Sequence, residues 1–259
     1  MSIQLSVVIP IFNEEDSLWP MAKGMAVHLN KYVGEERWQY VLVDNGSKDS
    51  TPKIVQRICS EWPLACPLQF SRPDYGDALR AGLLAATAEW AYIVNVDFWD
   101  PIFLAWSWSK RHRYDLILGS KRCDPSLNKQ TRYRRTLSWG LNTLLQFVFG
   151  FVGTDTHGQK FLKLSTMRSI IEQCVMRRGQ FDTEFTLRAM RQGLWLSEVP
   201  VPIVEGRKQR NWMIKKVVQN LLDIFRLRKI MRSVPRNHSI RYHRWAREDM
   251  QRAVEDLDS

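Results

Sequence analysis

The sequence predicts an α/β protein built on a doubly wound, mainly parallel sheet. Residues 3–120 alternate short apolar runs with longer amphipathic stretches, which is the pattern of strands joined by helical crossovers. Three of the apolar runs end in polar, acidic segments, at residues 13–15, 44–47 and 95–97. Ligands of open α/β sheets bind outside the carboxyl ends of the strands, so these three segments are expected to line one pocket.

The first half of the chain contains clear strand and helix signals. Two helix starts carry a capping residue followed by proline, Thr51 before Pro52 and Asp100 before Pro101. Helices are expected between the strands, and the strands are predicted at about residues 3–9, 39–43, 67–70, 91–96 and 115–119.

The pattern changes after about residue 121, where a basic loop precedes an apolar helix. Two helix boundaries further on are marked, by the expected cap Asp182 and by the stop Gly193. The expected elements are, in order, a helix ending near residue 149, a strand after residues 154–160, a helix from about 165, a helix over 182–193, a strand ending at 200, and a helix over 211–232.

The charge of the chain is concentrated near its end. The net charge is +11, and residues 207–247 hold 13 Lys or Arg against the single acid Asp223. We therefore divide the chain into a domain over residues 1–206, with halves 1–120 and 121–206, and a basic helical extension over 207–259. Such an extension favours an anionic partner, either a membrane surface or a nucleic acid.

Several classes of protein are excluded by composition. The four cysteines form no CxxC pair and no histidine lies at metal-ligand spacing from them, which favours reduced, mostly structural thiols. The chain enters its first strand without a signal-peptide pattern, and no run of about 18 apolar residues is present. A cytoplasmic protein that is neither secreted nor integral to a membrane is expected.

Six motifs together resemble the family 2 glycosyltransferases with a GT-A fold, and within them the polyprenyl (dolichyl) phosphate sugar synthases. The resemblance covers about residues 3–202 and implies a nucleotide-diphosphate sugar as donor. In chain order the motifs are Val8-Ile9-Pro10-Ile11-Phe12-Asn13-Glu14-Glu15, Val43-Asp44-Asn45-Gly46-Ser47-Lys48-Asp49-Ser50-Thr51, Ala78-Leu79-Arg80-Ala81-Gly82, Gly119-Ser120-Lys121, the segment 155–160, and Phe181-Asp182-Thr183-Glu184.

The resemblance assigns the first two motifs to the nucleoside. Pro10 and Phe12 would wall the base, Glu14 would approach the ribose or the base edge, and Asp44 would hydrogen-bond the base. Simpler roles compete with these: Asn13 would cap the first helix, and Asp44 would be an ordinary turn residue. Asp49 is equally consistent with a role in the turn alone.

The third strand-end segment resembles the family's Asp-x-Asp, with a departure. Asp97 matches the second carboxylate, which would hold Mg²⁺ or Mn²⁺ against the diphosphate. Asn95 stands where the first aspartate is expected; its amide oxygen can ligate the cation but adds no charge. Val96, between them, is expected to lie in the nucleotide-sugar site.

A second departure lies where the family usually shows Gly-x-Gly-x-Ala. Here the segment reads Asp74-Tyr75-Gly76-Asp77-Ala78. Gly76 is retained and allows close backbone approach to the nucleotide sugar, but the added acids would repel a diphosphate. The turn is therefore expected to face the base or the solvent.

Basic residues in the second half match those that hold phosphates in the synthases. Lys121, Arg134 and Arg135 would bind the acceptor phosphate, unless they are only a solvated charge run, and Arg207 would close over the diphosphate. Asp155 or Asp182 would be the general base if the acceptor were a hydroxyl. His157 is expected to be structural rather than catalytic.

The basic extension contains an amphipathic pattern. Its apolar residues fall at helical spacing and basic residues surround them, which favours an interfacial helix on anionic lipid over a helix docked to the core. No recognition motif supports nucleic-acid binding, and the oligomeric state is not specified by the sequence. The apolar positions are Ile214, Val217, Val218, Leu221 and Phe225.

The expected function is an inverting transfer of a sugar from a UDP- or GDP-sugar to a polyprenyl phosphate at the membrane surface. Two alternatives stay open at this point. One is a soluble transferase that glycosylates a hydroxyl of a polysaccharide, natural product or small molecule. The other is a catalytically silent protein that binds a nucleotide sugar, which the departures at Asn95 and Asp74 would explain.

Overall fold

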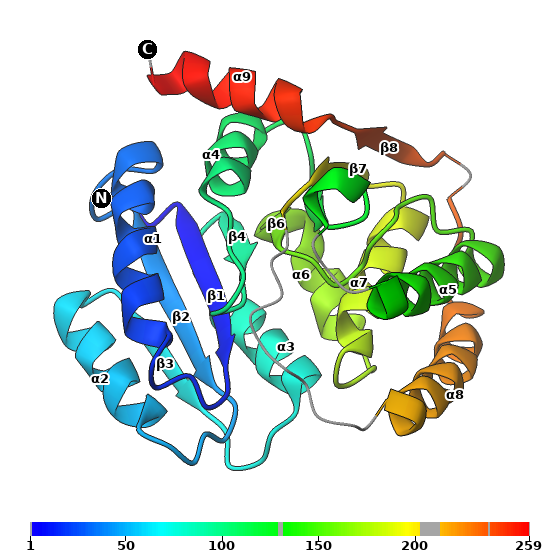
Figure 1. Cartoon of the computed structure of the whole chain (residues 1–259), viewed down its shortest axis with the longest axis horizontal. Helices are drawn as coiled ribbons and strands as arrows, with labels where there is room; N and C mark the ends of the chain where they lie inside the picture. The colour runs from blue at the N-terminus through cyan, green and yellow to red at the C-terminus, as the bar shows by residue number, and fades with distance from the viewer. Residues whose placement is uncertain (1, 129–131, 203–212, 238, 259) are drawn as a thin grey trace.

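The computed structural model describes residues 2–128, 132–202, 213–237 and 239–258. Within these residues, eight strands form one sheet in the order β3-β2-β1-β4-β6-β5-β7-β8 (Figure 1). The strands are β1 (Leu5–Ile11), β2 (Trp38–Asp44), β3 (Cys66–Gln69), β4 (Trp90–Ile93), β5 (Leu116–Ser120), β6 (Lys160–Lys163), β7 (Trp195–Pro200) and β8 (Arg241–Arg244).

Helices cover both faces of this sheet, as expected for a doubly wound fold. They are α1 (Leu18–Tyr32), α2 (Thr51–Glu61), α3 (Tyr75–Ala85), α4 (Pro101–Lys110), α5 (Arg132–Phe149), α6 (Leu164–Gln173), α7 (Gln180–Arg191), α8 (Met213–Met231) and α9 (Arg247–Asp258), with a short 3₁₀ turn over Pro125–Leu127.

The alternation of side chains along each strand creates two separate cores. In β1, Leu5, Val7 and Ile9 face α1, α2, α4 and α9, whereas Val8 faces the core shared by α3, α5, α6, α7 and α8. The molecule is therefore a three-layer sandwich whose sheet is apolar on both faces.

The predicted mainly parallel sheet is confirmed, with one exception. β6 runs antiparallel to both of its neighbours, β4 and β5. Its first residue, Lys160, pairs with Ile93 and with Leu118, near the carboxyl ends of those strands. The segment that precedes β6 is thereby brought to the edge of the sheet where β4 and β5 end.

One of the predicted helix caps is confirmed and two are wrong. Asp100 caps α4, because its Oδ1 accepts the backbone N–H of Ile102. Thr51 does not cap α2; Ser50 holds that position, and the Thr51 hydroxyl instead accepts the backbone N–H of Glu14. Asp182 does not cap α7 either.

The helix α7 begins at Gln180 with Gly179 at the N-cap position. Asp182 therefore lies inside the first turn, where its carboxylate pairs with Lys160. The loop before α7 is held against the helix, because Glu184 accepts the backbone N–H groups of Val175 and Met176.

The end of the basic extension packs into the fold. β8 pairs in parallel with β7, and α9 packs on α4. At the start of α9, Arg247 forms a buried ion pair with Asp100 and also donates to the carbonyl of Pro200.

The sequence did not indicate β8, since its four residues, Arg-Tyr-His-Arg, lack an apolar run. A domain boundary near residue 206 stays a prediction.

In the part of the chain that the structure describes, no helix combines the length and apolarity required to span a membrane.

Replacing Arg247 with leucine is expected to destabilise the fold by about 3 kcal/mol, because it leaves Asp100 as a buried charge without its ion-pair partner. Urea unfolding followed by circular dichroism measures the change. The matched control is Arg252→Leu, whose ion pair with Asp249 is exposed and whose loss should cost under about 0.5 kcal/mol. Equal effects of the two substitutions would contradict a structural role for the buried pair.

Candidate active site

The strand-end segments named in the sequence meet at one edge of the sheet. Ile11 pairs with Asp44, so the ends of β1 and β2 lie level. The backbone N–H of Val94 donates to the carbonyl of Val8, which places the end of β4 on the other side of β1. Residues 12–15, 45–47 and 95–97 therefore leave the sheet side by side.

Hydrogen bonds lock the first two segments together. The backbone N–H of Asn13 donates to Ser47 Oγ at 2.9 Å, and that of Lys48 donates to Asn13 Oδ1 at 2.9 Å. Asn13 adopts a positive φ of 54°, a conformation that asparagine tolerates better than most residues. Asn13 thus closes this junction and does not cap the first helix, because α1 begins later, with Ser17 at its N-cap.

Asp49 serves the turn before α2. Its Oδ1 accepts the backbone N–H of Thr51 at 3.0 Å, and its other oxygen accepts that of Glu15 at 3.4 Å. Burial is the largest single influence on the pKa of Asp49 and raises it, but the hydrogen bonds from Thr51 and Glu15 together outweigh burial, so the pKa lies below its usual value. The turn interpretation accounts for this residue.

Asp44 holds a buried carboxylate oxygen that has no protein partner. Its Oδ1 accepts the backbone N–H of Ser47 at 2.9 Å, while Oδ2 is buried without a hydrogen bond from any residue the structure describes. An unsatisfied buried acceptor is costly, which makes this oxygen a natural acceptor for an N–H group of a ligand. Of the other predicted nucleoside residues, Phe12 is exposed, whereas Pro10 and Glu14 are buried.

The acids of the turn before α3 are occupied by structural bonds. Asp74 caps the helix by accepting the N–H groups of Gly76 and Asp77, and its Oδ1 also accepts the N–H of Arg178. A Cβ at Gly76 would lie 2.6 Å from the backbone nitrogen of Arg178. The glycine is therefore required for packing against residues 177–178, whatever else the turn contacts.

The third segment is a tight turn at the end of β4. The backbone N–H of Phe98 donates to the carbonyl of Asn95, Val96 is buried in the core, and the Asp97 side chain is exposed. No described residue forms an ion pair with Asp97. The donor set is thus one free carboxylate with an amide two residues before it.

This donor set fits a cation that is held largely by its substrate. Across the described residues, no three His, Cys, Asp or Glu side chains gather into a metal-binding cluster. Mg²⁺ in phosphate sites commonly uses one or two carboxylates and completes its shell with phosphate oxygens and water. The exposed Asp97 meets that requirement, and Asn95 can add a neutral oxygen.

Two buried ion pairs lie on the other side of β4. Asp155 Oδ2 lies 3.6 Å from Lys121 Nζ, and Asp182 Oδ1 lies 2.8 Å from Lys160 Nζ. Both carboxylates and Lys160 are almost fully buried, whereas Lys121 keeps 20% of its side chain exposed. Lys121 is therefore the cation of this group that a ligand in solution can reach.

A short polar chain runs from Asp155 to Thr183, the neighbour of Asp182 in the sequence. Asp155 Oδ1 accepts the backbone N–H of His157, and the His157 ring contacts Thr156 Oγ1, which contacts Thr183 Oγ1 at 3.0 Å. Burial lowers the pKa of His157 against the opposing influence of Asp182 and Asp155, so its neutral form is favoured. Its contacts hold His157 within this polar chain, and its structural role stays a prediction.

The protonation of Asp155 reflects this environment. Burial raises the pKa of its carboxyl group, but the charge of Lys121 and the hydrogen bond from His157 more than offset this, so the pKa lies below its ordinary value. The carboxylate is ionised at neutral pH and is a weak proton acceptor.

A buried glutamate that the sequence analysis did not single out supports this group. Glu198 Oε1 accepts the backbone N–H and the hydroxyl of Thr154, both at 2.8 Å, and the N–H of Asp155 at 3.1 Å. Its other oxygen accepts from Tyr242 and Arg244 of β8. Glu198 thus ties the last strand of the sheet to the segment that holds Asp155.

Lys160 was also missed as a site residue. Lys160 could have been recognised as a charged residue at the start of an otherwise apolar strand. Glu198 is likewise a charged residue within the buried strand β7. Such charges in buried strands require partners, but the partners come from elements far away in the chain.

The structure does not describe the side chains of three predicted basic residues. Arg207 lies outside the described residues. Arg134 and Arg135 fall in the first turn of α5, but their side chains are not among those described.

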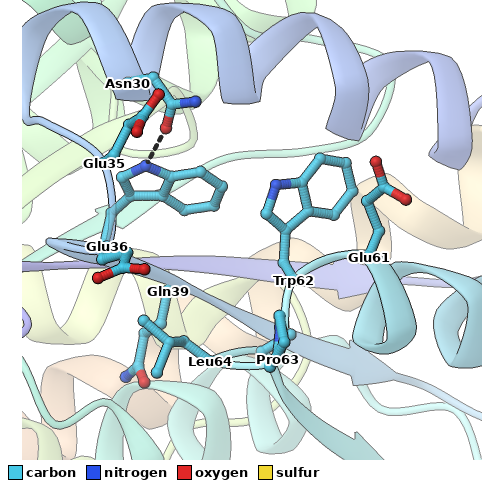
Figure 2. Close-up of a pocket in the computed structure, with 10 residues that line it drawn as sticks. Asn30, Glu35, Glu36, Gln39, Glu61, Trp62, Pro63 and Leu64 are labelled. Atoms are coloured by element: carbon cyan, nitrogen blue, oxygen red, sulfur yellow. Dashed lines mark hydrogen bonds between the residues drawn. The ribbon is translucent and has the colours of Figure 1, made fainter.

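A separate cavity of about 590 Å³ lies elsewhere, where β2 begins and α2 ends (Figure 2). Trp38 and Trp62 both line it, with ring centroids 6.3 Å apart, and so do Glu35, Glu36 and Glu61. None of the predicted site residues lines it. It lies at the amino end of β2, away from the edge at which the strand-end segments meet.

The sheet order, the three strand-end segments and the basic group beside them define a nucleotide-diphospho-sugar transferase of the GT-A type. A solved structure with a similar fold is the glucosyl-3-phosphoglycerate synthase of Mycobacterium tuberculosis in complex with Mg²⁺ and uridine diphosphate. The similarity covers 85% of this chain and 79% of that one, with a TM-score of 0.61 and 18% identity.

The sequence match is more specific. The model of the family described as Glycosyl transferase family 2 matches residues 6–167, and the chain belongs to that family. It is 29% identical to a dolichyl-phosphate beta-glucosyltransferase of Trichomonas vaginalis over 241 residues, 86% of this chain and 73% of that protein. It is 32% identical to a prophage bactoprenol glucosyl transferase homolog of Escherichia coli, over 53% of this chain and 44% of that protein.

Asp44→Asn is expected to weaken binding of uridine or guanosine diphosphate roughly tenfold or more, because it removes the charge from a buried acceptor of a ligand N–H. Isothermal titration calorimetry measures the dissociation constants. Glu36→Gln, beside the cavity of Figure 2, is the control and should leave both constants unchanged. An unchanged constant for Asp44→Asn would remove Asp44 from the nucleoside site.

The stability contributed by ionised Asp155 should depend on pH. Its pKa is lowered on folding, so this contribution is complete above the unfolded value of about 4 and is lost as the pH falls through the lower folded value. Urea unfolding of the wild type and of Asp155→Asn between pH 3 and pH 7 tests this. The difference between them should be constant above about pH 5 and shrink below pH 4. A difference that grows on acidification would contradict the lowered pKa.

Proposed function

We propose that this chain transfers a sugar, with inversion, from a UDP- or GDP-sugar to a polyprenyl phosphate. The observation that carries the proposal is the partly exposed Lys121 beside the buried, ionised Asp155, next to the strand-end segments assigned to the nucleotide. A cation placed there can hold an anionic acceptor. The names of the relatives, which specify dolichyl phosphate and bactoprenol as their acceptors, support the same substrate class.

The state of the candidate bases favours a phosphate acceptor over a hydroxyl. A hydroxyl must lose its proton to a base whose pKa is near neutrality, whereas a phosphate oxygen is already ionised. Asp155 has a lowered pKa, and Asp182 is held in an ion pair with Lys160 at 2.8 Å. Asp155 is therefore poorly suited to remove a proton at neutral pH, and the Asp182 carboxylate is buried and already engaged by Lys160.

The proposed reaction is a single displacement at the anomeric carbon. An oxygen of the acceptor phosphate forms a bond to that carbon while the bond to the diphosphate oxygen breaks, and the electron pair leaves with the nucleoside diphosphate. Attack from the face opposite the leaving group inverts the configuration. Asp44 and Glu14 would position the nucleoside, and Lys121 would align the attacking phosphate.

Mg²⁺ or Mn²⁺ would be held by Asp97, with Asn95 as a neutral oxygen donor. When bound, the cation supplies positive charge to the diphosphate as it leaves. Because the amide adds no charge, we propose that basic residues share this role, with Arg135 and Arg207 as the candidates.

The acceptor lipid implies a site of action at a membrane surface. We propose that the chain acts on the cytoplasmic side and that the 13 Lys or Arg of residues 207–247 attract it to anionic lipid. No nucleic-acid partner is proposed.

The decisive experiment incubates the full chain with UDP-glucose and other UDP- and GDP-sugars, Mg²⁺ and a short-chain, water-soluble prenyl phosphate. One glycosyl phosphate should form for each nucleoside diphosphate released. Lys121→Met should lower kcat/KM for the prenyl phosphate roughly a hundredfold, while the control Lys53→Met, on the exposed side of α2, leaves it unchanged. Transfer to sugar hydroxyls alone would favour the alternative acceptor class, and failure to bind any nucleotide sugar would refute the proposal.

Removal of the metal gives a second test. EDTA and Asp97→Ala should each abolish release of nucleoside diphosphate, and added Mn²⁺ should restore activity after EDTA but not to the variant. Restoring the carboxylate with Asn95→Asp should raise the affinity for Mn²⁺, measured by the activity at limiting metal. Turnover that survives both EDTA and Asp97→Ala would remove the metal from the mechanism.

A further inference from the structure

Beyond its first turn, the described residues on the exposed face of α5 carry no charge. The stretch 136–154 contains no Asp, Glu, Lys or Arg. Surface helices of soluble proteins normally expose charged and polar side chains on the side opposite the core. The exposed residues of α5 in this stretch are instead Thr136, Trp139, Gly140, Thr143, Gln146 and Phe147.

Two large aromatic side chains project from this face. Phe147 is 90% exposed and Trp139 is 60% exposed, while Leu145 and Phe149 of the same helix are buried in the core. The buried residues fix the rotation of α5, so the aromatic rings point away from the protein. Large apolar groups gathered on a surface mark an interaction site more often than single ones do.

The helix α8 presents similar residues beside basic ones. Leu222 is 58% exposed and Phe225 is 68% exposed, and Arg226 and Lys229 are exposed as well. Phe147 and Phe225 are the two most exposed large apolar side chains among those the structure describes. Aromatic residues flanked by cations are typical of helices that lie in the interface of an anionic bilayer.

The two helices lie at the same end of the molecule, on the side away from α1 and α2 (Figure 1). Buried residues of both belong to one core, including Leu145 of α5 and Leu227 of α8. The ends of the helices also approach each other, because a Cβ at Gly150 would lie 2.8 Å from Arg236 Nη2, just after α8. Their exposed residues can therefore meet one extended partner.

The helix α5 is also joined directly to the proposed acceptor group. The chain leaves the sheet at Lys121, passes through α5 and returns at Asp155. The ion pair between Lys121 and Asp155 joins the two ends of this segment. Near its end, Gln146 Nε2 donates to the carbonyl of Gly153 at 3.0 Å, which ties the helix to the returning segment.

We propose that Trp139, Phe147, Leu222, Phe225, Arg226 and Lys229 form a membrane-docking face, in which the four apolar side chains enter the interfacial region of an anionic bilayer. The cations complement the negative surface of the lipid, which selects a membrane over an uncharged protein partner. The part of the inference that concerns the acceptor rests on the proposed function: docking through α5 would bring a lipid-borne phosphate to Lys121 without a spanning helix.

The first test is co-sedimentation of the full chain with vesicles of phosphatidylglycerol and phosphatidylcholine. The double variant Trp139→Ser/Phe147→Ser should bind the vesicles at least roughly tenfold more weakly than the wild type, since two large apolar groups no longer transfer from water into the bilayer. Val27→Ser is the matched control, because Val27 is 66% exposed but lies on α1. Binding of the double variant equal to that of wild type would overturn the proposal.

The second test measures insertion directly. Vesicles containing brominated phosphatidylcholine should quench part of the tryptophan fluorescence of the wild type, and Trp139→Phe, which keeps the ring apolar, should remove most of that quenching while binding is retained. Equal quenching in the wild type and in Trp139→Phe would show that Trp139 does not enter the bilayer, which would contradict the proposed face. If the wild type is a dimer, and the double substitution yields a monomer that still binds vesicles, the face is an interface between two copies and the proposal fails.

The transfer assay separates this inference from the proposed function. With a short-chain, water-soluble prenyl phosphate and no vesicles, the double variant should transfer sugar at the wild-type rate. With a long-chain acceptor in vesicles, the double variant should lose most of its transfer rate. Equal rates in vesicles would overturn docking through this face. Absence of transfer from both proteins would refute the proposed function, whereas the binding and quenching results would still decide the docking face.

Discussion

The antiparallel insertion of β6 between β4 and β5 is the constraint on which the arrangement of the site depends. A parallel strand in that position would deliver its preceding loop to the opposite edge of the sheet. Because β6 runs the other way, Lys160 pairs with Ile93 and Leu118, and residues 154–159 arrive where β1, β2, β4 and β5 end. The candidate acceptor group and the candidate nucleotide group thereby share one edge.

Three buried charges at this edge are stable because each has an ion-pair partner. Lys160 is matched by Asp182, Asp155 by Lys121, and Glu198 by Arg244 together with several neutral donors. A buried ion without a partner would be neutralised or would unfold its surroundings. The pairing leaves Asp44 Oδ2 as a buried oxygen without a described partner, and of the two lysines only Lys121 is accessible to a ligand. These are the positions at which the protein can gain from binding a ligand.

Much of the first half could be read from the sequence, because its signals are local. Alternating apolar runs gave the strands to within a few residues, and the proline after Asp100 marked a true helix start. The caps at Thr51 and Asp182 were wrong for a non-local reason. The hydroxyl of Thr51 is used by Glu14, and the carboxylate of Asp182 by Lys160, and both partners come from other elements. The strand β8 was missed because it gains its stability from pairing with β7 and not from its own composition.

The sequence by itself determined the class of fold, the family and the three strand-end segments, since these follow from the order and spacing of residues along the chain. Only the tertiary structure decided which charges pair, that Glu198 connects β8 to Asp155, and that Arg247 returns to Asp100 across 147 positions. It also decided which side of α5 faces outward. Each of these depends on contacts between segments distant in sequence, and local propensity and periodicity carry no information about such contacts.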